Sequence, residues 1–150
     1  MHKLFVTISC FLWLSSVACA GDGLVKLRSS FDVKTTLDRF ESQLRSKGLT
    51  IFLRINHAEG AQKVGSQLRA TEVLLFGNPK LGSQLMACNP QVGLDLPQKA
   101  LAFEDSQGIV WLAYNAPSYL TEQHNLTGCE AAIQTLERGL SQFASAAASK

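Results

Sequence analysis

The side chain best suited to proton transfer in this chain is His57, which directly follows an alternating apolar run at residues 50–56. Residues two apart in a strand share a face, so the imidazole is expected beside the apolar side of a sheet. There it could bind a ligand or act as a general base, with Asp95 or Glu59 as its acidic partner. His57 and Asp95 also have a purely structural interpretation. His57 could cap the end of its strand through a backbone hydrogen bond, and Asp95 could close an Asx turn.

A second candidate is the turn Gly77–Gly82, which separates an apolar run from a helical pattern. Asn78 can cap that helix, and Pro79 suits its first position. Free N–H groups at a helix start attract anions, and Lys80 adds positive charge beside them. The run lacks the glycine and lysine spacing of a phosphate-binding loop. A strand-to-helix turn that needs these residues for backbone geometry alone is therefore the simpler interpretation.

Soft and imidazole side chains form a third candidate set, for a metal. Met86 and Cys88 stand two residues apart, and with His57 or His124 they would suit copper or haem iron. No C-x-x-C, C-x-x-C-H or H-E-x-x-H motif supports such a centre, and the sequence identifies no cofactor. Core packing of Met86 and a disulfide between Cys88 and Cys129 are the alternative. Two buried free thiols would also fit the cysteine count.

The elements that must hold these residues follow from apolar periodicity. Asp32 is a suitable N-cap for a first long helix, and a second long helix is expected near the C-terminal end. Strands are expected over 24–30, 50–56, 73–76, 99–104 and 109–115, with a short helix from Asn78 to about Cys88. The two helical stripes are Val33, Leu37, Phe40 and Leu44, and Ile133, Leu136, Leu140 and Phe143.

The strand 50–56 has a further consequence, because its alternation assigns each side chain to a face. Ile51, Leu53 and Ile55 are expected on the core side, and Arg54 and Asn56 on the other. The order of all the elements predicts an α+β fold, a mainly antiparallel sheet with two longer helices on one face. No internal repeat or linker divides residues 21–150, so a single domain is expected.

Two short elements carry a family resemblance. Phe76-Gly77-Asn78-Pro79-Lys80 follows an apolar run, and Asp95-Leu96-Pro97 stands before the next one. A segment beginning His57-Ala58 precedes both. In this combination the chain resembles the family called domain of unknown function 302, over roughly Val25 to Ile133. The resemblance implies a β-α-β(4)-α arrangement, to which this chain adds a short extra helix, and it implies no settled activity.

The N-terminus has the three parts of an export signal: a charged start, an apolar run at residues 4–14, and small residues ending in Ala18-Cys19-Ala20. Cleavage after Ala20 would release a periplasmic or extracellular domain from the signal peptide, residues 1–20. A lipoprotein anchored through Cys19 is the alternative. The apolar run is shorter than the ~20 residues of a membrane-spanning helix, so no stable membrane anchor is expected.

A net charge of +2 and the absence of any basic run argue against nucleic acid as a partner. The leading hypothesis is an exported single-domain protein that binds a small ligand or metal, without catalysis, near His57, Asn78, Lys80 and Asp95. The alternative is an acid–base enzyme centred on His57 with Asp95 or Glu59. A homo-oligomer that pairs through an uncovered sheet face is a third possibility.

Overall fold

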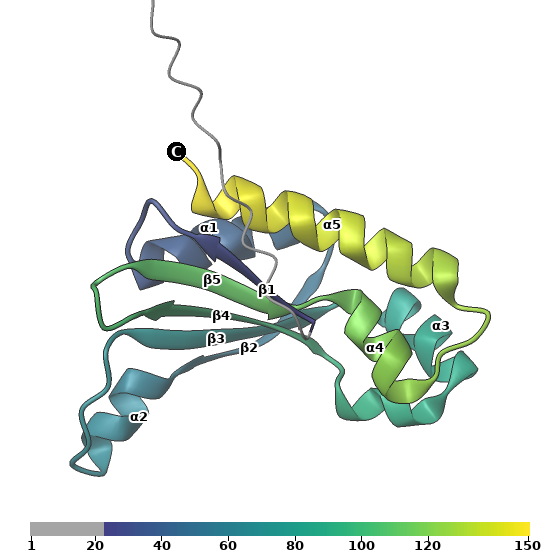
Figure 1. Cartoon of the computed structure of the whole chain (residues 1–150), viewed down its shortest axis with the longest axis horizontal. Coiled ribbons are helices and arrows are strands. Elements are labelled where there is room, and N and C mark those ends of the chain that lie inside the picture. Colours follow the sequence, from purple (N-terminus) through teal and green to yellow (C-terminus); the bar gives the residue numbers. More distant parts are fainter. Residues whose placement is uncertain (1–22) are drawn as a thin grey trace, which may run out of the picture.

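The computed structural model describes residues 23–150, and the predicted signal peptide, with Cys19 and Ala20, lies outside them. Its centre is a five-stranded sheet in the order β1-β5-β4-β3-β2, in which every neighbouring pair is antiparallel (Figure 1). The predicted α+β fold is confirmed. The strands are β1 (Leu24–Arg28), β2 (Thr50–Asn56), β3 (Thr71–Gly77), β4 (Gln98–Glu104) and β5 (Val110–Asn115). The helices are α1 (Val33–Ser46), α2 (His57–Lys63), α3 (Pro79–Cys88), α4 (Pro117–His124) and α5 (Glu130–Ala148), with a 3-10 turn η1 (Pro90–Leu94).

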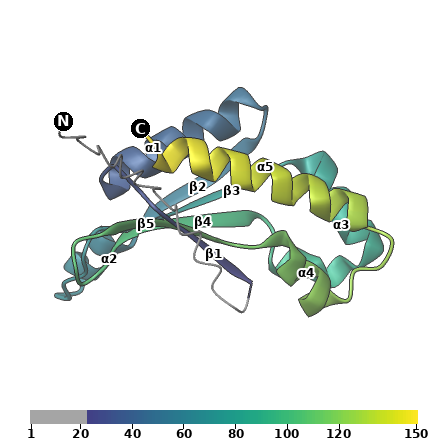
Figure 2. The same ribbon diagram turned by 45° about the horizontal axis from the view of Figure 1, so that its top comes forward.

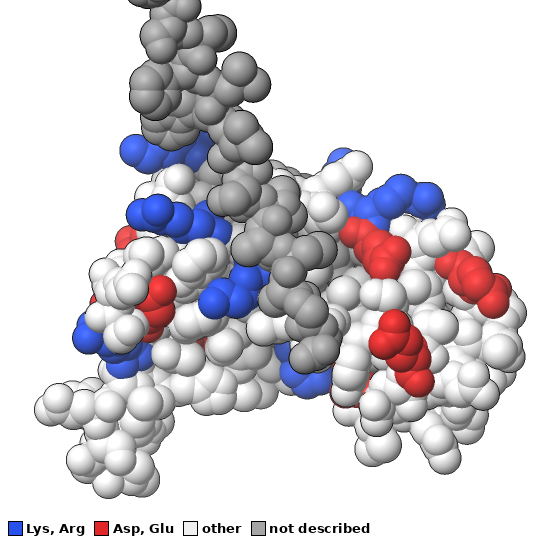
Figure 3. Space-filling view, viewed as in Figure 1, with Lys and Arg blue, Asp and Glu red and all other residues white. Residues whose placement is uncertain are grey.

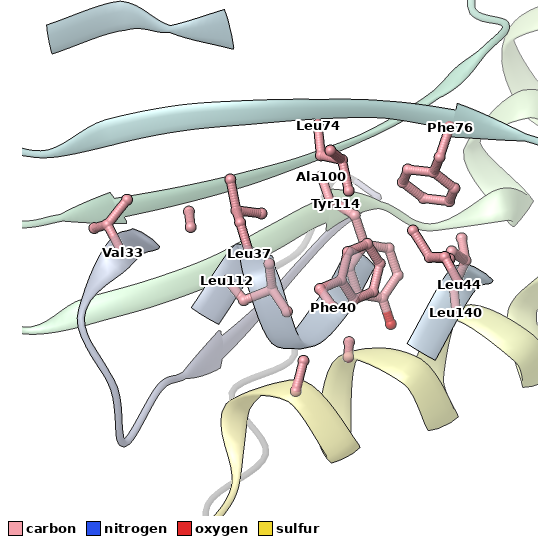
Figure 4. Packing of buried hydrophobic residues seen from close by; sticks show 13 residues of the cluster. Val33, Leu37, Phe40, Leu44, Leu74, Phe76, Ala100, Leu112, Tyr114 and Leu140 are labelled. Atoms are coloured by element: carbon pink, nitrogen blue, oxygen red, sulfur yellow. The ribbon is translucent and has the colours of Figure 1, made fainter. Parts of the chain in front are cut away.

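The two longest helices, α1 and α5, lie side by side on one face of the sheet (Figure 2). Asp32 caps α1 as expected, because its carboxylate accepts the backbone N–H of Thr35. The predicted stripe of α1 is buried against the sheet, where Phe40 meets Phe76 edge to face at 5.3 Å between ring centroids (Figure 4). The stripe residues Val33, Leu37, Phe40 and Leu44 are all at most 3% exposed.

The faces of β2 differ from the prediction because of a β-bulge. The register with β3 shifts between Ile51 and Leu53, so Phe52 has no partner on β3. One extra residue reverses the alternation beyond it. Arg54 therefore shares the helix-covered face with the buried Leu74, its partner on β3, whereas Leu53 lies on the opposite face.

Within residues 23–150, no helix covers the opposite face of the sheet (Figure 2). Strand register gives this face a band of apolar side chains. Lys26 crosses this band, with its ammonium 4.5 Å from the ring centroid of Trp111 and 5.5 Å from that of Phe103. Besides those two aromatic residues, strand register places Leu53, Ile55, Val73, Leu75 and Leu101 on this face. The core of the molecule lies on the other side, between the sheet and the two long helices.

A second, smaller core lies beyond one end of the sheet. It is formed by α3, η1, α4 and the first turns of α5, and we call this part of the molecule the disulfide end. A disulfide joins Cys88 to Cys129, with 6.5 Å between their Cα atoms. The opposite end, which we call the α2 end, consists of α2 and the adjoining ends of β2 and β3. The buried residues of the smaller core are Leu85, Val92, Leu120, Leu126, Cys129 and Ile133.

Candidate functional site

A cleft of about 790 Å³ opens where the disulfide end meets the helix-covered face of the sheet. Its walls come from α3, α5, the start of β2, the end of β3 and the segment that leads into β4. Most of the lining is aliphatic or aromatic, which is typical of sites for small organic molecules. The apolar side chains of the lining include Leu49, Phe52, Phe76, Leu81, Leu85, Met86, Leu96, Leu136, Leu140 and Phe143.

Two glycines inside helices help to keep this space open. Gly139 lies in the middle of α5 and Gly82 in the middle of α3, and both line the cleft. A Cβ at Gly139 would come within 3.5 Å of Phe143, and one at Gly82 within 3.7 Å of Leu96, which are ordinary contacts. Neither glycine is therefore required by a close backbone approach, although glycine costs a helix interior about 1 kcal/mol relative to alanine. Their consequence is unfilled volume in the cleft.

Polar groups in the cleft wall are few. Gln98 begins β4 opposite Phe76 and is only 7% exposed. Lys47, directly after α1, is exposed and is the one charged residue among the described residues that line the cleft. The other polar lining residues are Asn78, Ser83, Thr135 and Gln142.

The Gly77–Gly82 turn forms the predicted helix cap, and the cap occupies the backbone N–H groups that an anion would need as donors. The Asn78 side chain accepts the N–H groups of Lys80 and Leu81 at 3.0 and 3.4 Å. Its carbonyl accepts the N–H of Gly82 at 2.8 Å. Asn78 and Pro79 line the cleft, whereas the exposed Lys80 does not. The turn therefore shapes the cleft mouth rather than presenting free donors to it.

His57 lies far from this cleft. It is the first residue of α2 and is exposed, at the end of β2 opposite to the one that pairs with Gly77. The seven residues of β2 separate the two ends by ~20 Å. Glu59 accepts the side-chain amide of Asn56 and donates its backbone N–H to the same side chain, each at 3.0 Å. Asn56 thus caps α2, with Glu59 as its partner in the cap, and the structure does not bring His57 to Asp95.

Asp95 instead pairs with His124, at 2.6 Å between Oδ2 and Nε2. His124 is the last residue of α4 and is buried. Asn89, which caps η1, donates its side-chain amide to the His124 carbonyl at 2.8 Å. These contacts join α4 to the segment between α3 and β4, and none of the three residues lines the cleft. The pair holds the disulfide end together, and no spacing in the sequence indicated it.

The candidate metal residues are not assembled into one site. Cys88 is bonded to Cys129, Met86 lines the cleft, and His124 is paired with Asp95. Within residues 23–150 no three His, Cys, Asp or Glu side chains are grouped so as to hold a metal ion.

A sequence profile described as Domain of unknown function DUF302 matches residues 25–143, which is most of the chain. The chain belongs to this family. A solved structure with the same fold is an uncharacterized conserved DUF302 protein from Bacillus stearothermophilus. Its TM-score is 0.76 at 19% sequence identity, and the match covers 83% of this chain and 98% of the other. At that identity the likeness extends to the fold and no further.

Two relatives of the DUF302 chain are closer in sequence. Proteins named fluoride-specific ion channel FluC 1 from Brucella suis and FluC 2 from Brucella melitensis are each 40% identical to it over 118 residues. The match covers 78% of this chain but 46% and 44% of the two relatives, so the chain spans less than half of their length.

On the face shown in Figure 3, basic and acidic side chains are interspersed, and uncharged surface covers much of the disulfide end. The helices of residues 23–150 include none with the length and apolar character needed to cross a membrane.

The residues of the cleft that the sequence did not predict are mainly its apolar lining residues and Gln98. Their role depends on where the fold leaves space.

Proposed function

We propose that this DUF302 protein is exported and binds a small, mainly apolar molecule in the cleft, without catalysis. The observation that carries the proposal is the cleft itself, whose volume of about 790 Å³ lies in the range of small-molecule sites. A ring system that buries ~300 Å² of apolar surface there gains ~7 kcal/mol from desolvation. Association costs offset part of that gain, so micromolar to millimolar dissociation constants are expected for simple probes.

The absence of catalysis is proposed from the position of the titratable side chains. A general acid or base must come within hydrogen-bond reach of its substrate. His57, Asp95 and Glu59 are not among the residues that line the cleft. A substrate held in the cleft would therefore have no contact with these three side chains, which argues against the alternative of an acid–base enzyme centred on His57.

Export is proposed from the three-part N-terminal segment, with cleavage after Ala20. The bond between Cys88 and Cys129 supports it, because disulfides persist in oxidising compartments. Fluoride conduction is named for the Brucella relatives as whole proteins, which are more than twice as long as the shared segment. Fluoride is therefore included in the test below as a competing ligand.

The test is a calorimetric titration of the domain with 2-methylnaphthalene, an uncharged apolar probe. Gly139→Leu places a side chain in the cleft and should weaken binding by about tenfold or more. The matched control is Gly60→Leu in α2, where an added Cβ meets nothing within 4 Å. The control should bind like the parent. No saturable binding by the parent, equal binding by both variants, or a response to fluoride alone would contradict the proposal.

A further inference from the structure

Gln98 is a largely buried residue in the wall of the mainly apolar cleft, and its side-chain amide has no hydrogen-bond partner among residues 23–150. Among the buried polar residues of the described chain, Ser29 bonds Thr36 at 2.6 Å, and His124 bonds Asp95 at the same distance. The Gln98 side chain, by contrast, forms no hydrogen bond with another described residue. Burying an amide without a partner is unfavourable, and native proteins usually avoid it.

The amide of Gln98 opens onto the cleft. Among the described residues, every side-chain nitrogen or oxygen that is completely sealed from solvent has a hydrogen-bond partner. Because the Gln98 amide has none, its polar atoms cannot be sealed, and the space that Gln98 borders is the cleft. The remaining 7% exposure of this residue is thus directed at the position a ligand would occupy.

We propose that Gln98 determines the specificity of the cleft, by selecting apolar molecules that carry one uncharged hydroxyl or carbonyl oxygen over pure hydrocarbons. This inference rests on the proposed function and adds the ligand class. A glutamine amide both donates and accepts, so a hydroxyl or a carbonyl can satisfy it. A hydrocarbon of the same shape would cover Gln98 and leave its amide dry and unpaired, which penalises that ligand.

The oxygen is expected to be uncharged because the cleft offers little to balance a charge. Among the described residues of the lining, Lys47 is the one cationic side chain, and it is exposed directly after α1. A carboxylate held against Gln98, among side chains such as Phe76 and Leu140, would lose its hydration without gaining an ion pair. A carboxylate at Lys47 would leave Gln98 unpaired. The two polar groups therefore favour different ligands, which makes them separable by experiment.

The experiment compares three probes of one shape, namely 2-naphthol, 2-methylnaphthalene and 2-naphthoate, by calorimetric titration at neutral pH. The parent should prefer 2-naphthol to 2-methylnaphthalene by about tenfold, the size of one hydrogen bond to a buried group. Gln98→Met keeps the length of the side chain and removes the amide, so it should abolish or reverse that preference. Lys47→Gln should leave the preference unchanged.

Each outcome separates this inference from the proposed function on which it rests. If 2-naphthol and 2-methylnaphthalene bind the parent equally, Gln98 does not select the ligand, although the cleft still binds. If 2-naphthoate binds most tightly and Lys47→Gln removes that advantage, the polar contact is at Lys47 and the role of Gln98 is overturned. If no probe binds, both proposals fail. If Gln98→Met does not fold, Gln98→Leu takes its place, and retention of the preference by that variant would overturn the inference.

Discussion

The two ends of the sheet are closed by different physical means. At the α2 end, the Arg54 guanidinium bonds Glu72 at 2.7 Å and Asp38 at 2.6 Å, which joins β2 to β3 and α1. At the disulfide end, a covalent bond and the Asp95–His124 pair hold helices and turns beyond the sheet. None of the three charged side chains at the α2 end lines the apolar cleft, whereas the disulfide end borders it.

This contrast shows why a search for titratable side chains leads away from the apolar cleft. His57, Glu59 and Arg54 lie at or near the α2 end. Glu59 belongs to the cap of α2 and Arg54 to an ion-pair network, whereas His57 carries no side-chain hydrogen bond within residues 23–150. The cleft contains one charged side chain among its described lining residues, and its capacity to bind comes from apolar area.

The largest effect is expected from removal of the disulfide. The double variant Cys88→Ala, Cys129→Ala should lower the free energy of unfolding by about 2–5 kcal/mol, because the bond closes a long loop in the unfolded chain. Urea denaturation of the oxidised parent and the variant measures the difference. Equal midpoints and slopes would show that the smaller core holds the disulfide end without the bond.

A smaller loss is expected when the network at the α2 end is broken. Arg54→Met should cost about 1–2 kcal/mol at pH 7, because it leaves the largely buried Glu72 without its cation and removes one of the two cations that pair with Asp38. Hydrogen bonds from Lys34 and Arg54 hold the pKa of Asp38 below its usual value of 3.8. Its contribution to stability is therefore present above that value and is lost as the pH falls through the lower, folded-state pKa.

The deficit of the Arg54→Met variant should consequently shrink between pH 7 and the acidic end of the titration. Urea denaturation of parent and variant across that pH range measures it, with Lys34→Met as a control that removes only the exposed Lys34–Asp38 pair. A deficit that stays constant at low pH would mean that lost packing of the arginine stem, not its charge, destabilises the variant.

The smallest effect is expected at His57. His57→Ala should change the free energy of unfolding by no more than about 0.5 kcal/mol, because the side chain is exposed and carries no hydrogen bond in the described structure. Binding of 2-naphthol should be unaffected. Loss of binding in this variant would return the ligand site to the α2 end, where the sequence hypothesis placed it.

Much of the architecture could be predicted from the sequence, because it depends on local patterns. The stripe that includes Leu37 and Phe40, the cap at Asp32 and the turn at Asn78 each follow from spacing and residue type within a few positions. The faces of β2 could not be predicted, because a bulge at Phe52 depends on pairing with another strand, and phenylalanine fits either face.

The candidate site was less predictable, for a different reason. Asp95 and His124 are 29 residues apart and meet only because α4 folds back over the segment that follows η1. The cleft is volume left between elements, and glycines such as Gly139 look like ordinary helix imperfections in the sequence. In the sequence, Gln98 is an ordinary polar residue at the start of a strand, and only the structure shows that it is buried without a partner among the described residues. These are properties of tertiary packing rather than of any motif.

Which end of the molecule responds to a ligand can be measured directly. The chain contains two methionines, Met1 and Met86, and Met86 lines the cleft. NMR spectra of the ¹³C-methyl-methionine and histidine ring signals, recorded during titration with 2-naphthol, report on the two ends at once. The Met86 methyl signal should shift to saturation while the His57 ring signals stay in place. A saturating shift at His57 with an unchanged Met86 would contradict the account.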